Sequence, residues 1–148
     1  RAPLERYVAR VGRCNAARTD KPVPTGWCSW YHFFNHVSEA AMITNLAYLH
    51  SERKALPFKL VQLDDGYQTA WGDWSLLNER FPDTLEFLAG EMAAKGYTPG
   101  LWMAPFAADK HSQLAREHPD WILRKSERAG AAPVNSGYTH PGKWFHCL

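Results

Sequence analysis

Hydrophobic residues along the chain alternate between short apolar runs and longer stretches with helical spacing, and this alternation occurs three times. The apolar runs lie at residues 27–34, 58–63 and 100–106. Their aromatic and β-branched content is typical of strands that are covered on both faces. Each run is followed by apolar positions three or four residues apart, the spacing of one helix face. Strands that alternate with helices predict an α/β fold with parallel pairing.

Polar residues and a glycine mark where the predicted helices begin and end. Ser38 is a predicted N-cap of the helix that follows the first strand. Asp83 and Glu86 have the spacing of a capping box before the next helix. Gly96 is predicted to end that helix, because glycine readily adopts the left-handed conformation found after helix ends.

The two ends of the chain differ from this regular middle part. Residues 1–19 combine helical spacing with the start of a Pro- and Gly-containing connection, which predicts a helix and a linker. Residues 20–148 hold the strand–helix units. Within them, Ser112 is predicted to begin a short helix, and residues 120–148 are expected to be loop because Gly and Pro are scattered through them.

Two α/β architectures fit this pattern, a doubly wound open sheet and a (β/α)8 barrel. An open sheet that binds a nucleotide usually has a glycine-rich loop after its first strand. Bulky residues stand there instead, so no nucleotide cofactor is expected: Tyr31-His32-Phe33-Phe34. The barrel is favoured, and because a barrel takes roughly 250 residues, the chain is predicted to supply the first three βα units of a (β/α)8 TIM barrel and to stop before the fourth strand.

Charge and cysteine content exclude several classes of protein. Lys and Arg are interleaved with Asp and Glu at a formal net charge of +2, so no basic block suited to nucleic acid is present. No apolar run approaches the roughly 20 residues needed to span a bilayer. Three cysteines without a CxxC pair favour a reducing compartment, so a cytoplasmic location is expected.

The sharpest candidate for chemistry is the adjacent pair Asp64 and Asp65. It stands where an apolar strand ends and a glycine turn begins, and active sites of barrels lie at the carboxyl ends of strands. A plain Asp-Gly turn and a metal-ligand pair are the other interpretations. No further acidic cluster completes a metal cage, so no metal is expected. Neighbouring carboxylates can accept hydrogen bonds from two adjacent sugar hydroxyls more easily than they can flank a scissile bond. The pair is therefore predicted to bind the substrate and not to break the bond.

Tryptophans accompany this acidic pair. The chain has seven Trp and is 14% aromatic, which fits either core packing or flat faces for sugar rings. Trp30 and Trp102 lie near the ends of the first and third predicted strands. A further group lies in the loop after the second strand and is predicted either to line a pocket or to hold the loop down: Trp71, Asp73 and Trp74.

Several segments follow one another in the order and spacing of a known family. They are Gly26-Trp27-Cys28-Ser29-Trp30-Tyr31, Asp64-Asp65-Gly66-Tyr67-Gln68, Gly72-Asp73-Trp74, Asn78-x-x-Phe81-Pro82, Pro99-Gly100-Leu101-Trp102-x-Ala104-Pro105-Phe106 and His118-Pro119-Asp120-Trp121. Over about residues 20–124 the sequence resembles the melibiase barrel of glycoside hydrolase family 36. The resemblance implies a retaining α-galactosidase that acts on α-galactoside oligosaccharides and that can form homo-oligomers when intact.

The resemblance also implies roles for individual residues. The family's acidic pair, here Asp64 and Asp65, holds the 4- and 6-hydroxyls of the terminal galactose. The tryptophans that match Trp30 and Trp102 line the same subsite. The family's nucleophile is the Asp of a Lys-x-Asp motif on the fourth strand and its acid/base is an Asp on the sixth. This chain contains no Lys-x-Asp, so both catalytic residues are expected beyond residue 148 and the fragment alone is expected to be inactive.

Two other functions remain open at this point. A galactosyltransferase that resembles raffinose or stachyose synthase would share the barrel and the acidic pair, and products formed with an acceptor sugar would distinguish it. A non-catalytic galactose-binding module would lack the catalytic strands. Such a half-barrel would expose apolar strand edges, which favour aggregation.

Overall fold

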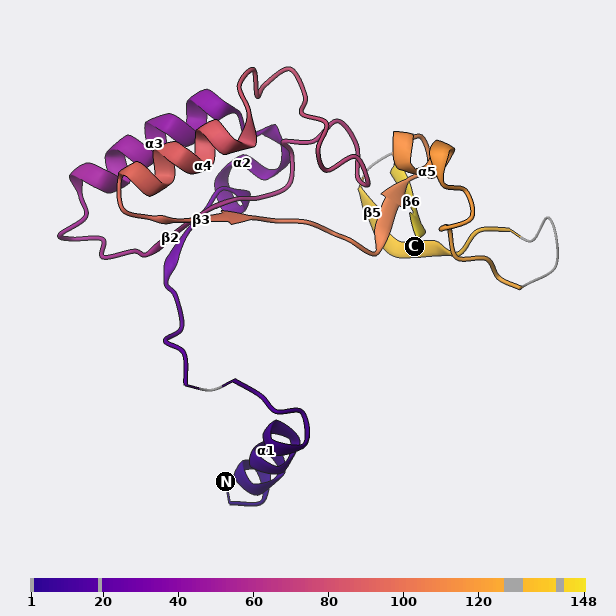
Figure 1. The fold of residues 1–148 in the computed structure, drawn as a ribbon, viewed down its shortest axis with the longest axis horizontal. Coiled ribbons are helices and arrows are strands. Elements are labelled where there is room, and N and C mark those ends of the chain that lie inside the picture. The colour runs from indigo at the N-terminus through magenta and orange to yellow at the C-terminus, as the bar shows by residue number, and fades with distance from the viewer. Residues whose placement is uncertain (1, 19, 127–131, 141–142) are drawn as a thin grey trace.

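The computed structural model describes residues 2–18, 20–126, 132–140 and 143–148 (Figure 1). The chain begins with α1 (Ala2–Cys14), which has no buried residue and lies away from the rest of the molecule on an extended linker. This helix confirms the prediction from the opening apolar spacing. Among the described residues, no helix has the length and apolarity needed to cross a bilayer.

A parallel sheet of three strands forms the centre of the molecule. Its strands β1 (Gly26–Cys28), β2 (Leu60–Leu63) and β3 (Thr98–Leu101) lie in the order β1-β2-β3. Gly26 pairs with Leu60 so closely that a Cβ at Gly26 would come within 2.4 Å of the Leu60 carbonyl oxygen. Parallel pairing in chain order confirms the predicted α/β class.

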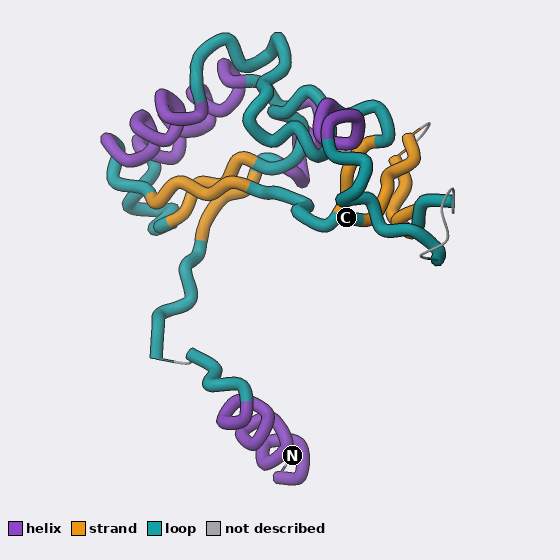
Figure 2. Tube along the Cα trace, turned by 45° about the vertical axis from the view of Figure 1, so that its right-hand side comes forward, coloured by secondary structure: helices purple, strands orange, loops and turns teal. Residues whose placement is uncertain are grey.

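Two helices cover one face of this sheet, as both views show (Figures 1 and 2). They are α3 (Glu39–Ser51) and α4 (Leu85–Ala94), each lying between two consecutive strands in the chain. Their apolar faces meet the inward side chains of β2 in one core, which includes Met42, Leu46, Val61, Leu63, Leu88 and Met92. Burial of these side chains, at about 25 cal/mol per Å² of apolar area, is the main stabilising contribution here.

Helix-start signals at two serines are confirmed. The Ser38 hydroxyl accepts the N–H of Ala41 at 3.2 Å at the start of α3. The Ser112 hydroxyl accepts the N–H of Ala115 at 3.1 Å at the start of α5 (Gln113–Glu117). Gly96, with φ +82°, follows the end of α4 as expected.

The predicted capping box at Asp83 is wrong. Thr84 is the N-cap of α4, and its hydroxyl accepts the N–H of Phe87 at 3.1 Å. The Asp83 N–H instead donates to the Glu39 carboxylate at 3.2 Å, which ties the approach to α4 to the first turn of α3. The cap is therefore one residue later than predicted, and the Asp83 N–H takes part in a tertiary contact.

The predicted first strand, residues 27–34, is too long. Strand β1 ends at Cys28, and the chain then turns into α2 (Trp30–Phe33) and the 3-10 turn η1 (Phe34–His36). The Phe33 N–H donates to the Ser29 carbonyl at 3.1 Å, which closes the turn. Aromatic residues favour strands by their propensity, but here local hydrogen bonding outweighs it.

The carboxyl-terminal part forms a second sheet that the sequence patterns did not indicate. Its strands β4 (Ala107–Asp109), β5 (Asn135–His140) and β6 (Lys143–Cys147) pair antiparallel in the order β4-β6-β5. The loop prediction for residues 120–148 is therefore wrong at β5 and β6, whereas the described residues from 120 to 134 belong to no helix or strand. The predicted strand at 100–106 is also wrong in extent, because β3 ends at Leu101 and β4 belongs to the other sheet.

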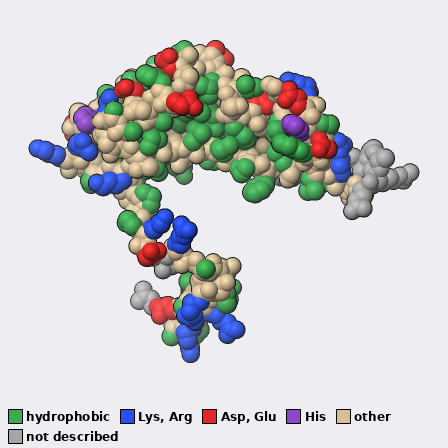
Figure 3. Space-filling view, viewed as in Figure 1, with side chains coloured by type: hydrophobic (Ala, Val, Ile, Leu, Met, Phe, Trp, Pro, Cys, Tyr) green, Lys and Arg blue, Asp and Glu red, His purple; other side chains and the backbone are tan. Residues whose placement is uncertain are grey.

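Apolar side chains remain exposed where the chain leaves the parallel sheet. Leu101 and Met103 are each 44% exposed and Phe106 is 78% exposed. Figure 3 shows hydrophobic side chains gathered along the lower edge of the body, below the layer of helices. The two helices thus cover only part of the apolar surface of this α/β unit.

Candidate functional site

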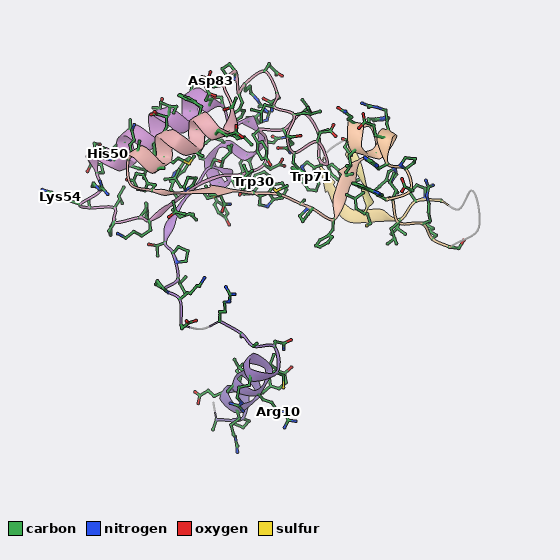
Figure 4. All side chains as sticks on the ribbon, viewed as in Figure 1. Arg10, Trp30, His50, Lys54, Trp71 and Asp83 are labelled. Carbon is green, nitrogen blue, oxygen red and sulfur yellow. The ribbon has the colours of Figure 1, made fainter. Side chains whose placement is uncertain are left out.

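The carboxyl ends of the three parallel strands bring the predicted site residues to one edge of the sheet. Asp64 and Asp65 directly follow β2. Trp102 follows β3, and its N–H donates to the Leu63 carbonyl at 2.9 Å. Trp30 follows β1 by two residues and lies close to the strands, whereas Trp71 lies between the two sheets (Figure 4).

Asp64 is held from the side of the sheet. Its Oδ2 accepts the Gln62 amide at 2.8 Å and the Cys28 thiol at 3.2 Å. Its Oδ1 accepts the N–H of Asp65 at 2.9 Å. The N–H of Asp64 donates to the Ser29 hydroxyl at 2.9 Å. The residue is 7% exposed, and these hydrogen bonds fix the direction of its carboxylate.

Asp65 is held from the side of the following loop. Its Oδ1 accepts the Gln68 amide at 2.6 Å and the Trp71 indole N–H at 3.1 Å. Asp65 and Trp71 line the same pocket of about 240 Å³. Trp30, Asp64 and Trp102 lie outside the lining of that pocket. The structure therefore brings one acid of the predicted pair together with an indole in a cavity and places the other acid against the sheet.

Gly66 joins three segments around this pocket. Its carbonyl accepts the Asn78 amide at 2.7 Å and the Arg80 guanidinium at 3.0 Å. At φ +119° its backbone has a conformation that residues with a side chain rarely adopt. A Cβ at this position would come within 2.7 Å of the Asn35 carbonyl oxygen. Only glycine allows η1 to approach the turn after Asp65 so closely.

Trp71, Trp74 and Trp102 form one indole cluster. The Trp71 ring centroid lies 5.3 Å from that of Trp102, and Trp74 lies 6.1 Å from Trp102 in an edge arrangement. Phe145 of β6 stacks on Trp71 with a centroid distance of 4.1 Å and an interplanar angle of 21°. Trp30 contacts Phe34 edge-on at 5.5 Å.

Asp73, predicted either to line a pocket or to hold its loop, holds the start of α5. Its two carboxylate oxygens accept the N–H groups of Gln113 at 2.9 Å and Leu114 at 3.0 Å. Those N–H groups have no acceptor within the helix. Asp73 therefore fixes the loop that carries Trp71 and Trp74 against the second sheet.

Two titrating groups next to the acidic pair are kept protonated by their surroundings. Burial and the charge of Asp65 raise the pKa of Tyr67 to about 12, and the Tyr67 hydroxyl donates to the Trp102 carbonyl at 3.2 Å. Burial, with a smaller contribution from Asp64, raises the pKa of the Cys28 thiol. Both groups therefore act as hydrogen-bond donors at neutral pH. The part of the chain described by the structure contains no group of three or more His, Cys, Asp or Glu that could hold a metal ion.

Comparison with known proteins identifies the family of the chain. The Melibiase family profile matches residues 6–136 of the chain. The chain belongs to the melibiase family. Its resemblance to that family, first seen in the motifs around the acidic pair, is thereby confirmed.

Curated melibiase relatives are similar at moderate identity. The α-galactosidase AgaA of Geobacillus stearothermophilus is 31% identical over 132 residues, which cover 84% of this chain and 17% of the relative. The A type blood α-D-galactosamine galactosaminidase of Flavonifractor plautii is 32% identical over 120 residues, which cover 78% of this chain and 11% of the relative. The chain thus spans less than a fifth of the length of these relatives.

Solved structures of α-galactosidases have the same fold as this melibiase chain. The Thermus thermophilus α-galactosidase in complex with stachyose is 36% identical with a TM-score of 0.77, over 88% of this chain and 27% of that one. The family 36 α-galactosidase AgaA of G. stearothermophilus is 27% identical with a TM-score of 0.65, over 76% of this chain and 16% of that one. The α/β arrangement is therefore shared with known melibiases.

Several residues of the pocket in this melibiase chain were not predicted from the sequence. Asn35, Gln68, Arg80 and Phe145 all line it. Gln68 and Asn78 stand in the motifs that resemble the melibiase barrel, so their positions in the sequence were a usable signal. Phe145 gave no local signal, because its place beside Trp71 depends on the pairing of β6 with β4.

Proposed function

We propose that this chain is part of an α-galactosidase, a retaining glycoside hydrolase that releases terminal α-linked galactose, and that it supplies galactose-recognition residues of the catalytic domain. The observation that carries the proposal is the adjacent carboxylate pair at the end of β2, with Asp65 facing a cavity beside the Trp71 indole. Membership of the melibiase family supports it, as do the α-galactosidase names of its relatives.

We also infer that the parallel sheet is the first part of a (β/α)8 barrel. The strands pair in chain order, and a helix follows each of the first two on the same face, as the right-handed crossovers of a barrel require. In such a barrel the active site lies at the carboxyl ends of the strands. Asp64 and Asp65 are at such an end.

The chemistry of the pair suits recognition of a sugar. Sugar hydroxyls donate to carboxylate oxygens in charge-assisted hydrogen bonds, which are roughly twice as strong as neutral ones. Asp64 and Asp65 are neighbours, and the Asp65 N–H donates to the Asp64 carboxylate, so they do not oppose each other across a scissile bond at roughly 5–5.5 Å as a retaining pair does. The nucleophile and the acid/base are therefore expected elsewhere in the longer protein.

The expected substrates are α-galactoside oligosaccharides. One solved relative holds stachyose and another holds raffinose. In the proposed reaction a carboxylate attacks the anomeric carbon while an acid protonates the leaving oxygen, and water then releases the galactose. The Flavonifractor relative favours a second candidate, release of terminal α-galactosamine.

Hydrolysis by the complete protein tests the proposal. Aryl α-galactoside, α-galactosaminide and α-glucoside are compared at equal concentration, and the galactoside is expected to be the best substrate. A preference for the galactosaminide would support the second candidate. Absence of turnover on all three, with a folded protein, would contradict both. Galactose transferred to an added acceptor sugar, in excess over free galactose, would indicate a transferase.

A further inference from the structure

Donors from two strands hold the Asp64 carboxylate. Cys28 and Gln62 are register partners on β1 and β2, and both donate to Oδ2 of Asp64, the thiol at 3.2 Å and the amide at 2.8 Å. The same Gln62 amide lies 3.6 Å from the Cys28 sulfur, so the three side chains of Cys28, Gln62 and Asp64 contact one another. The cluster is built on paired strands, so its geometry follows the sheet and not the loops.

The backbone of Asp64 is fixed separately. The Ser29 hydroxyl accepts its N–H at 2.9 Å, and Ser29 is fully buried. With the backbone held in this way, the carboxylate can turn only about its own side-chain bonds. The donors at Oδ2, together with the Asp65 N–H at Oδ1, therefore determine which way it faces.

The pattern of accepted hydrogen bonds leaves one position for a ligand. A carboxylate has about four lone-pair sites. In the described part of the chain, Oδ2 accepts Cys28 and Gln62, and Oδ1 accepts the N–H of Asp65. The second lone pair of Oδ1 is the one available to a sugar hydroxyl.

We propose that Cys28 is a positioning residue for Asp64: its thiol donates to Oδ2 and thereby fixes the orientation of the carboxylate, which leaves the second lone pair of Oδ1 for a galactose hydroxyl. The inference rests on the proposed function for its ligand, but the thiol–carboxylate pair itself does not. Because burial and Asp64 raise the pKa of Cys28, the thiol keeps its proton at neutral pH and acts as a donor. A thiolate at this place would repel the carboxylate.

Thiol reactivity of the 148-residue chain tests the pair without any galactoside. The rate of Cys28 alkylation by iodoacetamide is followed across pH by mass analysis of its peptide, which separates it from Cys14 and Cys147. Asp64→Asn removes the negative charge and is expected to lower the midpoint of the pH–rate profile and to speed alkylation several-fold below it. Asp65→Asn is the control, because the Asp65 carboxylate contacts Gln68 and Trp71 instead.

Kinetics of the complete protein test the positioning role. Cys28→Val removes the donor and is expected to raise KM for an aryl α-galactoside by about tenfold, with a smaller change in kcat, because a hydrogen bond to a charged group is lost. Cys28→Ser keeps a donor and is expected to remain near the wild-type KM. The two variants differ in size as well as in hydrogen bonding, so urea denaturation of both accompanies the kinetics. A rise in KM in Cys28→Val that exceeds its loss of stability relative to Cys28→Ser is expected, because a merely structural role would change KM only in parallel with stability.

The outcomes distinguish the two ideas. An unchanged alkylation profile in Asp64→Asn, or equal KM values for Cys28→Val and Cys28→Ser, would overturn the role of Cys28. A wild-type complete protein that is folded but hydrolyses no galactoside would contradict the proposed function, and the alkylation profile would still decide the thiol–carboxylate pair.

Discussion

At the scale of single residues, the two adjacent acids occupy different surroundings. Asp64 is held by donors on the strands, whereas Asp65 is held by Gln68 and Trp71 in the loop. Both are nearly buried, at 7% and 3% exposure. Burying a carboxylate is costly unless hydrogen bonds compensate, and the different partners explain how two acids can stand side by side here.

Removal of either acid is expected to weaken galactoside turnover by the complete protein. Asp64→Ala or Asp65→Ala should lower kcat/KM by roughly 10- to 150-fold, because a hydrogen bond to a charged group contributes about 1.5–3 kcal/mol. Steady-state kinetics with an aryl α-galactoside measure this. Asp20→Ala, in the exposed linker, is the control. Unchanged kinetics in both variants would remove the pair from the site.

Gly66 is expected to tolerate no side chain. Gly66→Ala should lower the free energy of unfolding by more than about 1 kcal/mol, because φ is +119° and the new Cβ would meet the Asn35 backbone. Gly90→Ala is the matched control: Gly90 lies within α4 with nothing near its Cβ position, so stabilisation by about 1 kcal/mol is expected. Urea denaturation compares the two, and equal effects would be inconsistent with the close approach at Gly66.

Tyr67 is expected to make stability fall at alkaline pH. Its folded pKa of about 12 lies above the ordinary 10.0, so folding favours the protonated phenol. That contribution is complete below pH 10 and is lost as pH rises from 10 toward 12. Denaturation midpoints should therefore fall more steeply over this range in the wild type than in Tyr67→Phe. Parallel curves would show that Tyr67 does not titrate with unfolding.

At the scale of elements, strand ends and helix starts position the site. Strand β2 places the acidic pair, and the start of α4 is tied to α3 through the contact of Asp83 with Glu39. The capping side chain is that of Thr84. The identity of a cap depends on which residue the tertiary structure leaves in extended conformation before the first helical turn.

The N-cap assignment can be tested directly. Thr84→Ala should destabilise the chain by about 1 kcal/mol, because the Phe87 N–H loses its acceptor. Asp83→Ala, one residue earlier, keeps its backbone N–H and therefore its contact with Glu39. It should cost less. Urea denaturation measures the loss of stability in both variants. A larger loss in Asp83→Ala than in Thr84→Ala would indicate that Asp83 is the cap.

At the scale of the whole molecule, the second sheet completes the pocket of the first. Phe145 of β6 is 1% exposed and stacks on Trp71, whose indole N–H donates to Asp65. Trp71 and Phe145, which are far apart in the chain, thus line the same pocket. The two sheets are coupled through this stack and through the hydrogen bonds that the Asp73 carboxylate accepts from the start of α5.

Loss of this aromatic stack should loosen the pocket. Phe145→Leu is expected to destabilise the chain by about 1 kcal/mol beyond the effect of lost area, as aromatic pairs contribute 0.5–1.5 kcal/mol, and to weaken the near-UV circular dichroism of the indoles. Phe106→Leu is the control, because Phe106 is 78% exposed. Identical spectra and stability for the two variants would argue against the stack.

The sequence by itself determined the features that depend on neighbouring residues. Apolar spacing and capping serines predicted α3 and the start of α5, and an apolar run followed by Asp64-Asp65-Gly66 placed the acids at a strand end. Such signals arise from backbone hydrogen bonding and side-chain periodicity within a few residues, which a linear pattern records.

Only the tertiary structure decided which distant residues meet. The pairing of β4 with β6, the stack of Phe145 on Trp71 and the donation of Cys28 to Asp64 join residues 36 or more positions apart. Local propensity even pointed the wrong way at residues 29–34, where a turn replaced a strand. Contacts of this kind depend on how complete elements pack against each other, and no short stretch of sequence specifies that.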